Sequence, residues 1–197
     1  MRRGAFIPIF FAAMLGAALS GCGEKKEAAA PPPQDVSADS VAYFCNMLVD
    51  EHPGPKGQVF VTDREEPYWF ASARDAIAFT MLPGEPKNIA AIYVTDVGRA
   101  KNWDHPEPGT WVDARKAFFV IESRKTGGMG AAEAVPFSEE QAARDFVAEY
   151  GGRIVRFADM PQDYILSYGV GPEGQGMDMG RMPPDHPQTS PGQHDEP

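Results

Sequence analysis

A pattern of two strands, a helix and a third strand occurs twice along the middle of the chain. In each half, two strand-like runs precede a helix, and the helices begin at the capping pairs Ser72/Asp75 and Ser138/Gln141. The expected strands are residues 58–62, 68–70, 89–95, 117–121, 134–137 and 153–157. Neither half alone is large enough to build a stable core. We therefore predict an α+β fold in which two related ββαβ units pack as one small domain.

Each expected helix has one apolar face. Its apolar side chains return every three or four positions, which is the periodicity of a helix with one buried side. These side chains are Ala73, Ala76, Ile77 and Met81 in the first helix and Ala142, Phe146, Val147 and Tyr150 in the second. Pro83-Gly84 ends the first helix and Gly151-Gly152 ends the second. Both helices can therefore bury one side against the rest of the domain.

The first 21 residues have the pattern of a secretory signal peptide with a lipoprotein cleavage box. Arg2 and Arg3 precede an apolar run that ends in Leu19-Ser20-Gly21-Cys22. The run is shorter than the roughly 20 residues that a membrane-spanning helix needs. We expect cleavage before Cys22, which becomes the lipidated first residue, with a simple signal anchor as the alternative. Gly23, rather than an acidic residue, follows this cysteine and favours an outer-membrane anchor that faces the periplasm.

Two low-complexity segments flank the expected domain. Residues 22–40 are polar and rich in alanine and proline, which is typical of a flexible tether between a lipid and a domain. Residues 170–197 are dense in glycine, proline, aspartate and glutamine, so we expect a disordered tail rich in methionine, proline and glycine. The folded domain is expected to span residues 41–169, with halves at about 41–97 and 110–168.

The charge balance excludes some partners. Removal of residues 1–21 takes away two of the 18 basic residues and none of the 28 acidic ones, which leaves a net charge of −12. Such a charge argues against binding to nucleic acid and against electrostatic binding to an anionic lipid surface. It suits a soluble periplasmic partner or a cation, or serves solubility alone.

The chain has two cysteines, and lipidation of Cys22 leaves Cys45 without an intramolecular partner. A lone thiol in an oxidising compartment is open to oxidation and disulfide exchange, so it needs deep burial or a function. One alternative is an inert, buried cysteine that acts as a small hydrophobic residue. Met47 lies two residues further along the chain, and thiolate and thioether ligands together select Cu(I).

Other side chains could complete such a site. Met129 is flanked by glycines at the tip of an expected hairpin, where it could close over a metal ion or fold back into the core. His52 could supply a nitrogen ligand or a contact to a ligand, or could be a solvated loop residue. Met81 and Met160 are expected to fill the core. The tail holds donors that could recruit copper loosely or be only low-complexity sequence: Met177, Met179, Met182, His186 and His194.

The sequence gives little support for catalysis. It has no Gly-x-Ser-x-Gly elbow, phosphate loop, His-Glu-x-x-His pair or dinucleotide fingerprint. Cys45 could in principle act as a nucleophile with a histidine base, but His52 and His105, the two histidines of the expected domain, both precede prolines in loops. We therefore expect that the protein is not an enzyme.

Several segments together resemble the NosL family, copper-binding lipoproteins of the accessory set for nitrous oxide reductase. They are the lipobox at Cys22, Cys45-Asn46-Met47, residues 51–58, Tyr68-Trp69-Phe70 leading into Arg74-Asp75, and Gly128-Met129-Gly130. The resemblance covers about residues 41–168. It implies paired ββαβ units, a Cu(I) site, and delivery of copper toward the reductase through a membrane-associated maturation complex. The family's topology is similar to that of organomercurial lyase, whose chemistry needs paired cysteines, and this chain offers only one.

These observations lead to one hypothesis and one rival. The hypothesis is a periplasm-facing Cu(I) metallochaperone that serves denitrification, with Cys45, Met47 and Met129 as metal ligands and His52 as a further ligand or a neighbour of the ligands. Its partners would be the maturation complex, a copper-receiving protein and, through the lipid on Cys22, the membrane. The rival is a structural or interaction lipoprotein that binds no metal and has an inert, buried Cys45.

Overall fold

The computed structural model of the chain describes residues 29–128 and 130–167. The first unit consists of β1 (Gly57–Val61), β2 (Tyr68–Phe70), α1 (Ala73–Met81) and β3 (Ile89–Thr95). The second unit consists of β5 (Phe118–Ile121), β6 (Val135–Phe137), α2 (Glu140–Tyr150) and β7 (Arg153–Arg156). The remaining elements are η1 (Val49–Glu51), β4 (Trp111–Asp113), η2 (Phe157–Asp159) and α3 (Gln162–Leu166).

Both units use the same sheet order. The first strand of each unit lies in the centre, paired antiparallel with the second and third strands, which gives the orders β2-β1-β3-β4 and β6-β5-β7. The predicted pair of ββαβ units is therefore confirmed. The short strand β4 was not predicted, and it pairs with β3, so the first sheet gains a strand from the sequence that follows the first unit.

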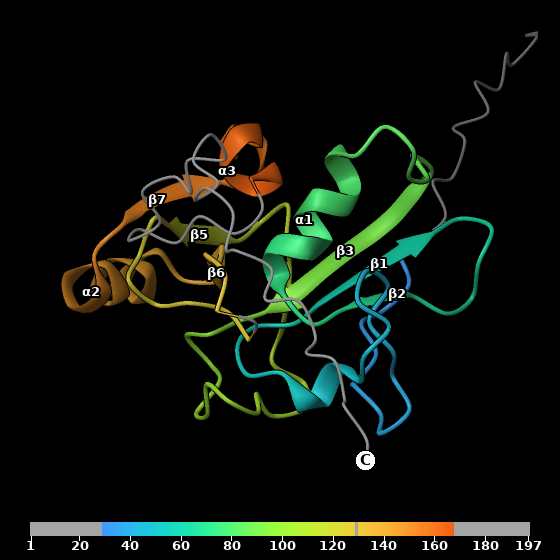
Figure 1. The fold of residues 1–197 in the computed structure, drawn as a ribbon, viewed down its shortest axis with the longest axis horizontal. Helices are drawn as coiled ribbons and strands as arrows, with labels where there is room; N and C mark the ends of the chain where they lie inside the picture. Colours follow the sequence, from blue (N-terminus) through green and yellow to red (C-terminus); the bar gives the residue numbers. More distant parts are fainter. Residues whose placement is uncertain (1–28, 129, 168–197) are drawn as a thin grey trace, which may run out of the picture.

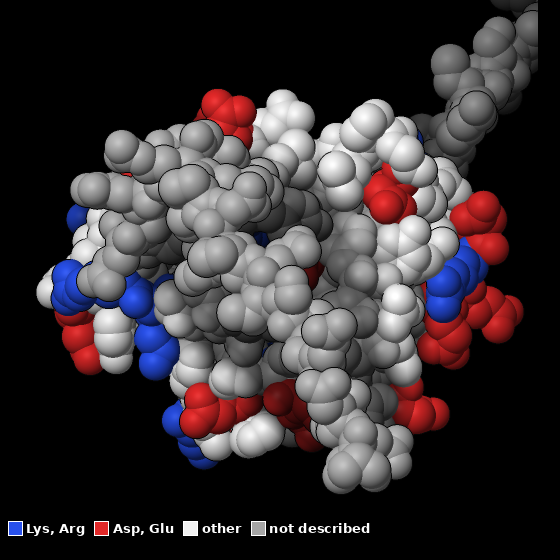
Figure 2. Space-filling view, in the orientation of Figure 1, with Lys and Arg blue, Asp and Glu red and all other residues white. Residues whose placement is uncertain are grey.

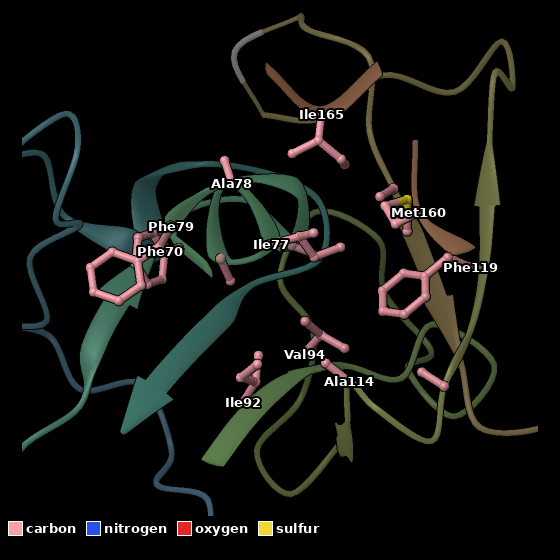
Figure 3. Packing of buried hydrophobic residues seen from close by; sticks show 14 of the residues in the cluster. Phe70, Ile77, Ala78, Phe79, Ile92, Val94, Ala114, Phe119, Met160 and Ile165 are labelled. Atoms are coloured by element: carbon pink, nitrogen blue, oxygen red, sulfur yellow. The ribbon is translucent and has the colours of Figure 1, made fainter. Parts of the chain in front are cut away.

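The two units share one apolar core. Figure 1 shows α1 lying along the first sheet, with α2, β5 and β7 on the other side of the molecule. Figure 3 shows Ile77 of α1 facing Phe119 of β5, with Met160 beside that ring. Met160 is 7% exposed and Met81 packs partly buried against the same cluster, as expected for core methionines. Side chains of both units meet in this largest cluster, and a smaller cluster of Val120, Val135, Phe137 and Ala143 lies between α2 and the second sheet.

The helices bury different amounts of surface. The predicted face of α1 is buried at Ala73, Ala76 and Ile77, but Ala78 and Phe79 are buried as well. Phe79 packs against the rings of Tyr43, Tyr68 and Phe70, and α1 also contacts α3 and β6. The helix α2 lies at the edge, and of its residues only Ala143 is fully buried, while its predicted face packs partly buried on β5 and β6.

One predicted helix cap is present and the other is not. The hydroxyl group of Ser72 accepts a hydrogen bond from the backbone N–H of Asp75 at 3.3 Å and caps α1. Ser138 does not cap α2, which begins after Glu139 without a side-chain cap. The backbone N–H of Ser138, which a capping box would pair with the Gln141 side chain, instead donates to the carboxylate of Asp96 at 3.1 Å and ties the second unit to the end of β3.

Part of the expected tether lies against the domain. The hydroxyl group of Tyr93 donates to the carbonyl of Pro31 at 2.8 Å, and Gln34 and Gln58 exchange two hydrogen bonds. The carboxylate of Asp35 accepts from the indole N–H of Trp111 at 3.2 Å. Contacts with the domain therefore begin at Pro31, ahead of the expected boundary at residue 41. The expected signal peptide, the lipidation site Cys22 and the tail, residues 170–197, lie outside the described residues.

None of the helices in residues 29–128 and 130–167 combines the length and the apolar character needed to cross a membrane.

Substitution of Gly57 tests the close approach of β1 to α1. A Cβ atom at Gly57 would lie 2.4 Å from the Cβ of Ala76, which is closer than real Cβ atoms come. Overpacking of this kind typically costs about 1–3 kcal/mol. We expect Gly57→Ala to lower the urea midpoint of unfolding, whereas Gly84→Ala, where a Cβ would meet nothing within 4 Å, leaves it nearly unchanged. Equal midpoints for the two variants would contradict this packing.

Candidate metal site

Cys45 and Met47 lie on a tight loop. The backbone N–H of Ala42 donates to the carbonyl of Met47 at 2.8 Å, and that of Asn46 donates to the carbonyl of Ala42 at 2.9 Å. Asn46 has a φ of 56°, a left-handed conformation that asparagine tolerates better than most residues. The cysteine and the methionine therefore flank the residue at which the chain reverses.

The loop is fixed to the first sheet through Trp69. Ala42 forms a parallel bridge with Trp69, and the backbone N–H of Tyr43 donates to the carbonyl of Trp69 at 2.8 Å. A small apolar cluster of Ala42, Val49 and Ala71 contacts Trp69 and Cys45 from the side of the domain. The sequence motif is thus held on the edge strand β2.

The loop exposes its sulfur-bearing side. Cys45 is a free cysteine and is only partly buried, and Met47 is 40% exposed. Among the described residues, the large hydrophobic side chains that are exposed all belong to this segment: Val41, Tyr43 and Met47. These three side chains lie within seven consecutive residues of the chain. A soft ion or a partner protein can therefore reach the thioether.

His52 lies close after the loop, beyond η1. Its ring nitrogen Nε2 is buried and has no hydrogen-bond partner among the described residues. Buried polar atoms without a partner are rare in folded proteins, and a bound water molecule or ion often satisfies those that occur. His52 therefore differs from an ordinary solvated loop histidine, and its free nitrogen suits a soft or borderline metal ion.

The loop that carries Met129 lies against His52. Met129 itself falls outside the described residues, but its neighbours form a closed turn in which the N–H of Gly127 donates to the carbonyl of Ala131 at 2.9 Å. A Cβ atom built on Gly128 would lie 2.8 Å from the Cβ of His52 and 2.6 Å from the carbonyl oxygen of Pro53. The structure therefore brings this turn to the segment that follows Cys45 and Met47.

Clusters of oxygen and nitrogen donors were sought in the described part of the chain. Within residues 29–128 and 130–167, no three side chains of histidine, cysteine, aspartate and glutamate lie close enough together to hold a metal ion. His105 faces Asp50 at 3.7 Å, and both side chains are exposed. The exposed thioether of Met47 is a further donor that this part of the chain offers to a soft metal ion.

Sequence reasoning missed two buried charged residues beside this region. Lys56 is 4% exposed, and its amine donates to the backbone carbonyl of His52. Burial lowers the pKa of Lys56 to about 8. Glu133 is 1% exposed, and burial raises its pKa to about 7. Each residue looks like an ordinary loop charge in the sequence, and no local pattern distinguishes it.

The two carboxyl oxygens of Glu133 differ in their hydrogen bonding. Its Oε1 accepts from the backbone N–H groups of Arg74 and Ala134, each at 2.9 Å, and from the hydroxyl group of Ser72 at 3.2 Å. Its Oε2 is buried without a partner among the described residues. The carboxyl group thus joins the start of α1 to the strand that follows the Met129 turn.

The two ββαβ units share a core, and a short segment ahead of the first unit carries a thiol, a thioether and an imidazole group. These features define a class of small domains suited to a soft metal ion. Comparison of the chain with known protein families identifies the family within that class. The NosL family model matches residues 33–165, and this chain belongs to the NosL family.

Proteins similar in sequence or structure support the assignment to this family. The copper-binding lipoprotein NosL of Achromobacter cycloclastes is 42% identical over 152 residues, which cover 77% of this chain and 78% of that protein. The protein of the same name from Stutzerimonas stutzeri is 34% identical over 152 residues, with the same coverage of each chain. The crystal structure of the copper chaperone NosL from Shewanella denitrificans gives a TM-score of 0.62 at 33% identity and covers 67% of this chain and 98% of that one.

The raised pKa of Glu133 predicts how stability changes with pH. The usual glutamate value is 4.5, so the folded protein holds this proton more tightly than the unfolded chain does. The resulting stabilisation is complete below about pH 4.5 and is lost as the pH rises through about 7. Its size is on the order of 3 kcal/mol, at about 1.4 kcal/mol per pKa unit.

Glu133→Gln should remove this loss. We expect the free energy of unfolding in urea, measured from pH 4.5 to 7.5, to fall more steeply for the unmodified protein than for the variant. Glu139→Gln, at an exposed position, is the matched control and should follow the unmodified protein. Parallel profiles for all three proteins would contradict the assigned shift.

Proposed function

We propose that this protein binds Cu(I) and hands it on as a metallochaperone. The observation that carries the proposal is the exposed loop on which Cys45 and Met47 flank the left-handed Asn46, in a chain of the NosL family. Thiolate and thioether ligands favour Cu(I) over zinc, magnesium and calcium. The copper ion is the cargo of the protein and not a resident cofactor.

The proposed ligands are Cys45, Met47 and Met129. Cys45 supplies the anionic sulfur, and Met47 is held next to it by the short loop. Met129 follows Gly128, which lies against His52, so its position in the chain allows it to join the same region. His52 either binds the ion through a ring nitrogen or forms a hydrogen bond to one of the ligands. Its unpartnered Nε2 supports both roles. A site that has few ligands and stays partly exposed can release the ion to a partner.

The proposed recipient is a protein that takes part in the maturation of nitrous oxide reductase. Delivery would proceed through a membrane-associated complex, with this protein anchored by a lipid on Cys22 at the periplasmic face of the outer membrane. The naming of two relatives as lipoproteins supports the anchor. Copper transfer moves an ion between ligands and needs no general acid, general base or covalent intermediate, so we propose no catalytic activity.

The surface beside the loop suits the approach of a partner. An open hollow of about 440 Å³ lies next to residues 41–43 and is bordered by Asn46, Arg64 and Glu66. Asp63, Glu65 and Glu66 are exposed on the turn between β1 and β2, and Figure 2 shows acidic side chains around a basic one at the corresponding edge of the molecule. A partner with an apolar contact surface and basic residues around it would complement this region.

The rival function is a structural lipoprotein that docks a partner without metal. Both functions use an acidic surface, but only the metallochaperone uses the thiol. An alkylating reagent separates them, because it should modify Cys45 in the metal-free protein and fail to do so once Cu(I) is bound. A thiol that stays unreactive in both states would favour the rival.

Removal of the thiol should abolish tight copper binding. Cys45 is the only cysteine among the described residues, so Cys45→Ala leaves the proposed site without an anionic sulfur. The side chain is only partly buried, and we therefore expect a loss of stability below the roughly 2–5 kcal/mol range of large core truncations. Metal content after anaerobic purification and desalting is the measurement. One tightly held Cu(I) per monomer in the variant would exclude the proposed site.

Replacement of the methionines by leucine separates ligands from core residues. Leucine keeps the size and apolar character of methionine, and such exchanges usually cost less than about 1.5 kcal/mol. We expect Met129→Leu and Met47→Leu to fold normally but to lose Cu(I) to a competing chelator more readily than the unmodified protein. Met160→Leu, in the core, should retain copper normally. Retention by Met129→Leu equal to that of the unmodified protein would remove Met129 from the site.

A further inference from the structure

Residues 126–128 and 130–132, on either side of Met129, lie between two parts of the molecule. On one side, a Cβ atom at Gly127 would lie 2.6 Å from Oε2 of Glu133. On the other side, a Cβ atom at Gly128 would lie 2.6 Å from the carbonyl oxygen of Pro53 and 2.8 Å from the Cβ of His52. A side chain at Gly128 would meet the backbone of Pro53, whereas a side chain at Gly127 would displace the carboxyl group of Glu133.

Glu133 is fixed to the first turn of α1. Three donors converge on its Oε1, two of them from Ser72 and Arg74 at the start of that helix. Arg74 is 6% exposed and extends the connection, since its guanidinium group donates to the carbonyl of Ala132 at 3.0 Å and to that of Ile165 at 3.1 Å. The base of the turn and α3 are thus both tied to the same end of α1.

The turn and α1 do not fill all of the space between them. A cavity of about 80 Å³ remains between them, lined by Ser72, Asp75 and Ala78 of α1 and its cap and by Gly127 and Gly128 of the turn. The Glu133 carboxyl group spans from α1 to Gly127 beside this cavity. An apolar side chain of similar size would fill space at lower cost, since burial of a carboxyl group is expensive. What the carboxyl group adds is a fixed geometry.

We propose that Glu133 is a positioning residue for the metal site, acting through Gly127 and Gly128 to hold His52 in place. The inference rests on the proposed function, because His52 matters only if copper binds there. Glu133 does not touch the ion. It holds the turn at Gly127, the turn at Gly128 leaves no room for a Cβ atom beside the Cβ of His52, and the positions open to the imidazole that carries the unpartnered Nε2 are thereby limited. Residues that orient metal ligands commonly change metal affinity by about 10- to 100-fold when they are replaced.

The test is Cu(I) competition against a chelator, using the full chain. We expect Gly127→Ala and Glu133→Ala each to weaken Cu(I) retention by about 10- to 100-fold. Glu133→Gln should restore retention, because the amide oxygen can accept the same three hydrogen bonds. Gly84→Ala is the matched control, since a Cβ there meets nothing within 4 Å, and it should behave as the unmodified protein. Retention by Gly127→Ala and Glu133→Ala equal to that of the control would overturn the proposal.

A double-mutant cycle separates positioning from a general loss of structure. If Gly127 acts through His52, the effect of Gly127→Ala should disappear in the His52→Ala background. A purely structural effect would give the same loss in both backgrounds and would overturn the proposal. Thermal transitions of the metal-free proteins show which variants fold, and should Gly127→Ala not fold, the comparison of Glu133→Ala with Glu133→Gln decides. Failure of the unmodified protein to bind Cu(I) would instead overturn the proposed function.

Discussion

One apolar core shared by both ββαβ units is the constraint on which the rest of the structure depends. Ile77 of the first unit and Phe119 of the second are fully buried in the same cluster, and Met160 and Ile165 close it from the C-terminal end. A three- or four-stranded sheet with one helix buries too little surface to be stable alone. The units must therefore pack together, and their packing fixes where their loops meet.

Polar contacts at the junction then fix the orientation that apolar packing alone leaves loose. Asp96, at the end of β3, is fully buried and accepts hydrogen bonds from Gly98 and Ser138, each at 3.1 Å. Glu133 and Arg74 make a second junction at the start of α1. A buried polar group without a hydrogen-bond partner destabilises the folded protein. Each junction therefore allows few relative positions of the two units. The Met129 turn reaches His52 as a result.

The elements follow closely from local sequence, and the exceptions have identifiable causes. The strand β2 and the cap at Ser72 occur where the aromatic run at residues 68–70 and the capping pair place them. Ser138 shows the same pairing with a glutamine three residues later, yet its backbone N–H binds Asp96, 42 positions earlier in the chain. The strand β4 has three residues and depends on β3 for its hydrogen bonds, so no local periodicity reveals it. Asp35 likewise finds its partner 76 positions away.

The sequence by itself determined the order of the strands and helices in the two ββαβ units, the unpaired thiol of Cys45 and the soft donor two residues beyond it. Those features depend on side-chain type and on spacing over a few residues. Only the tertiary structure decided that His52 lies beside the Met129 turn, that Glu133 is buried and that Arg74 binds the carbonyl of a residue 91 positions away. The physical reason is that burial and hydrogen-bond partnership belong to pairs of residues brought together by packing, and a single segment of sequence carries information about only one member of each pair.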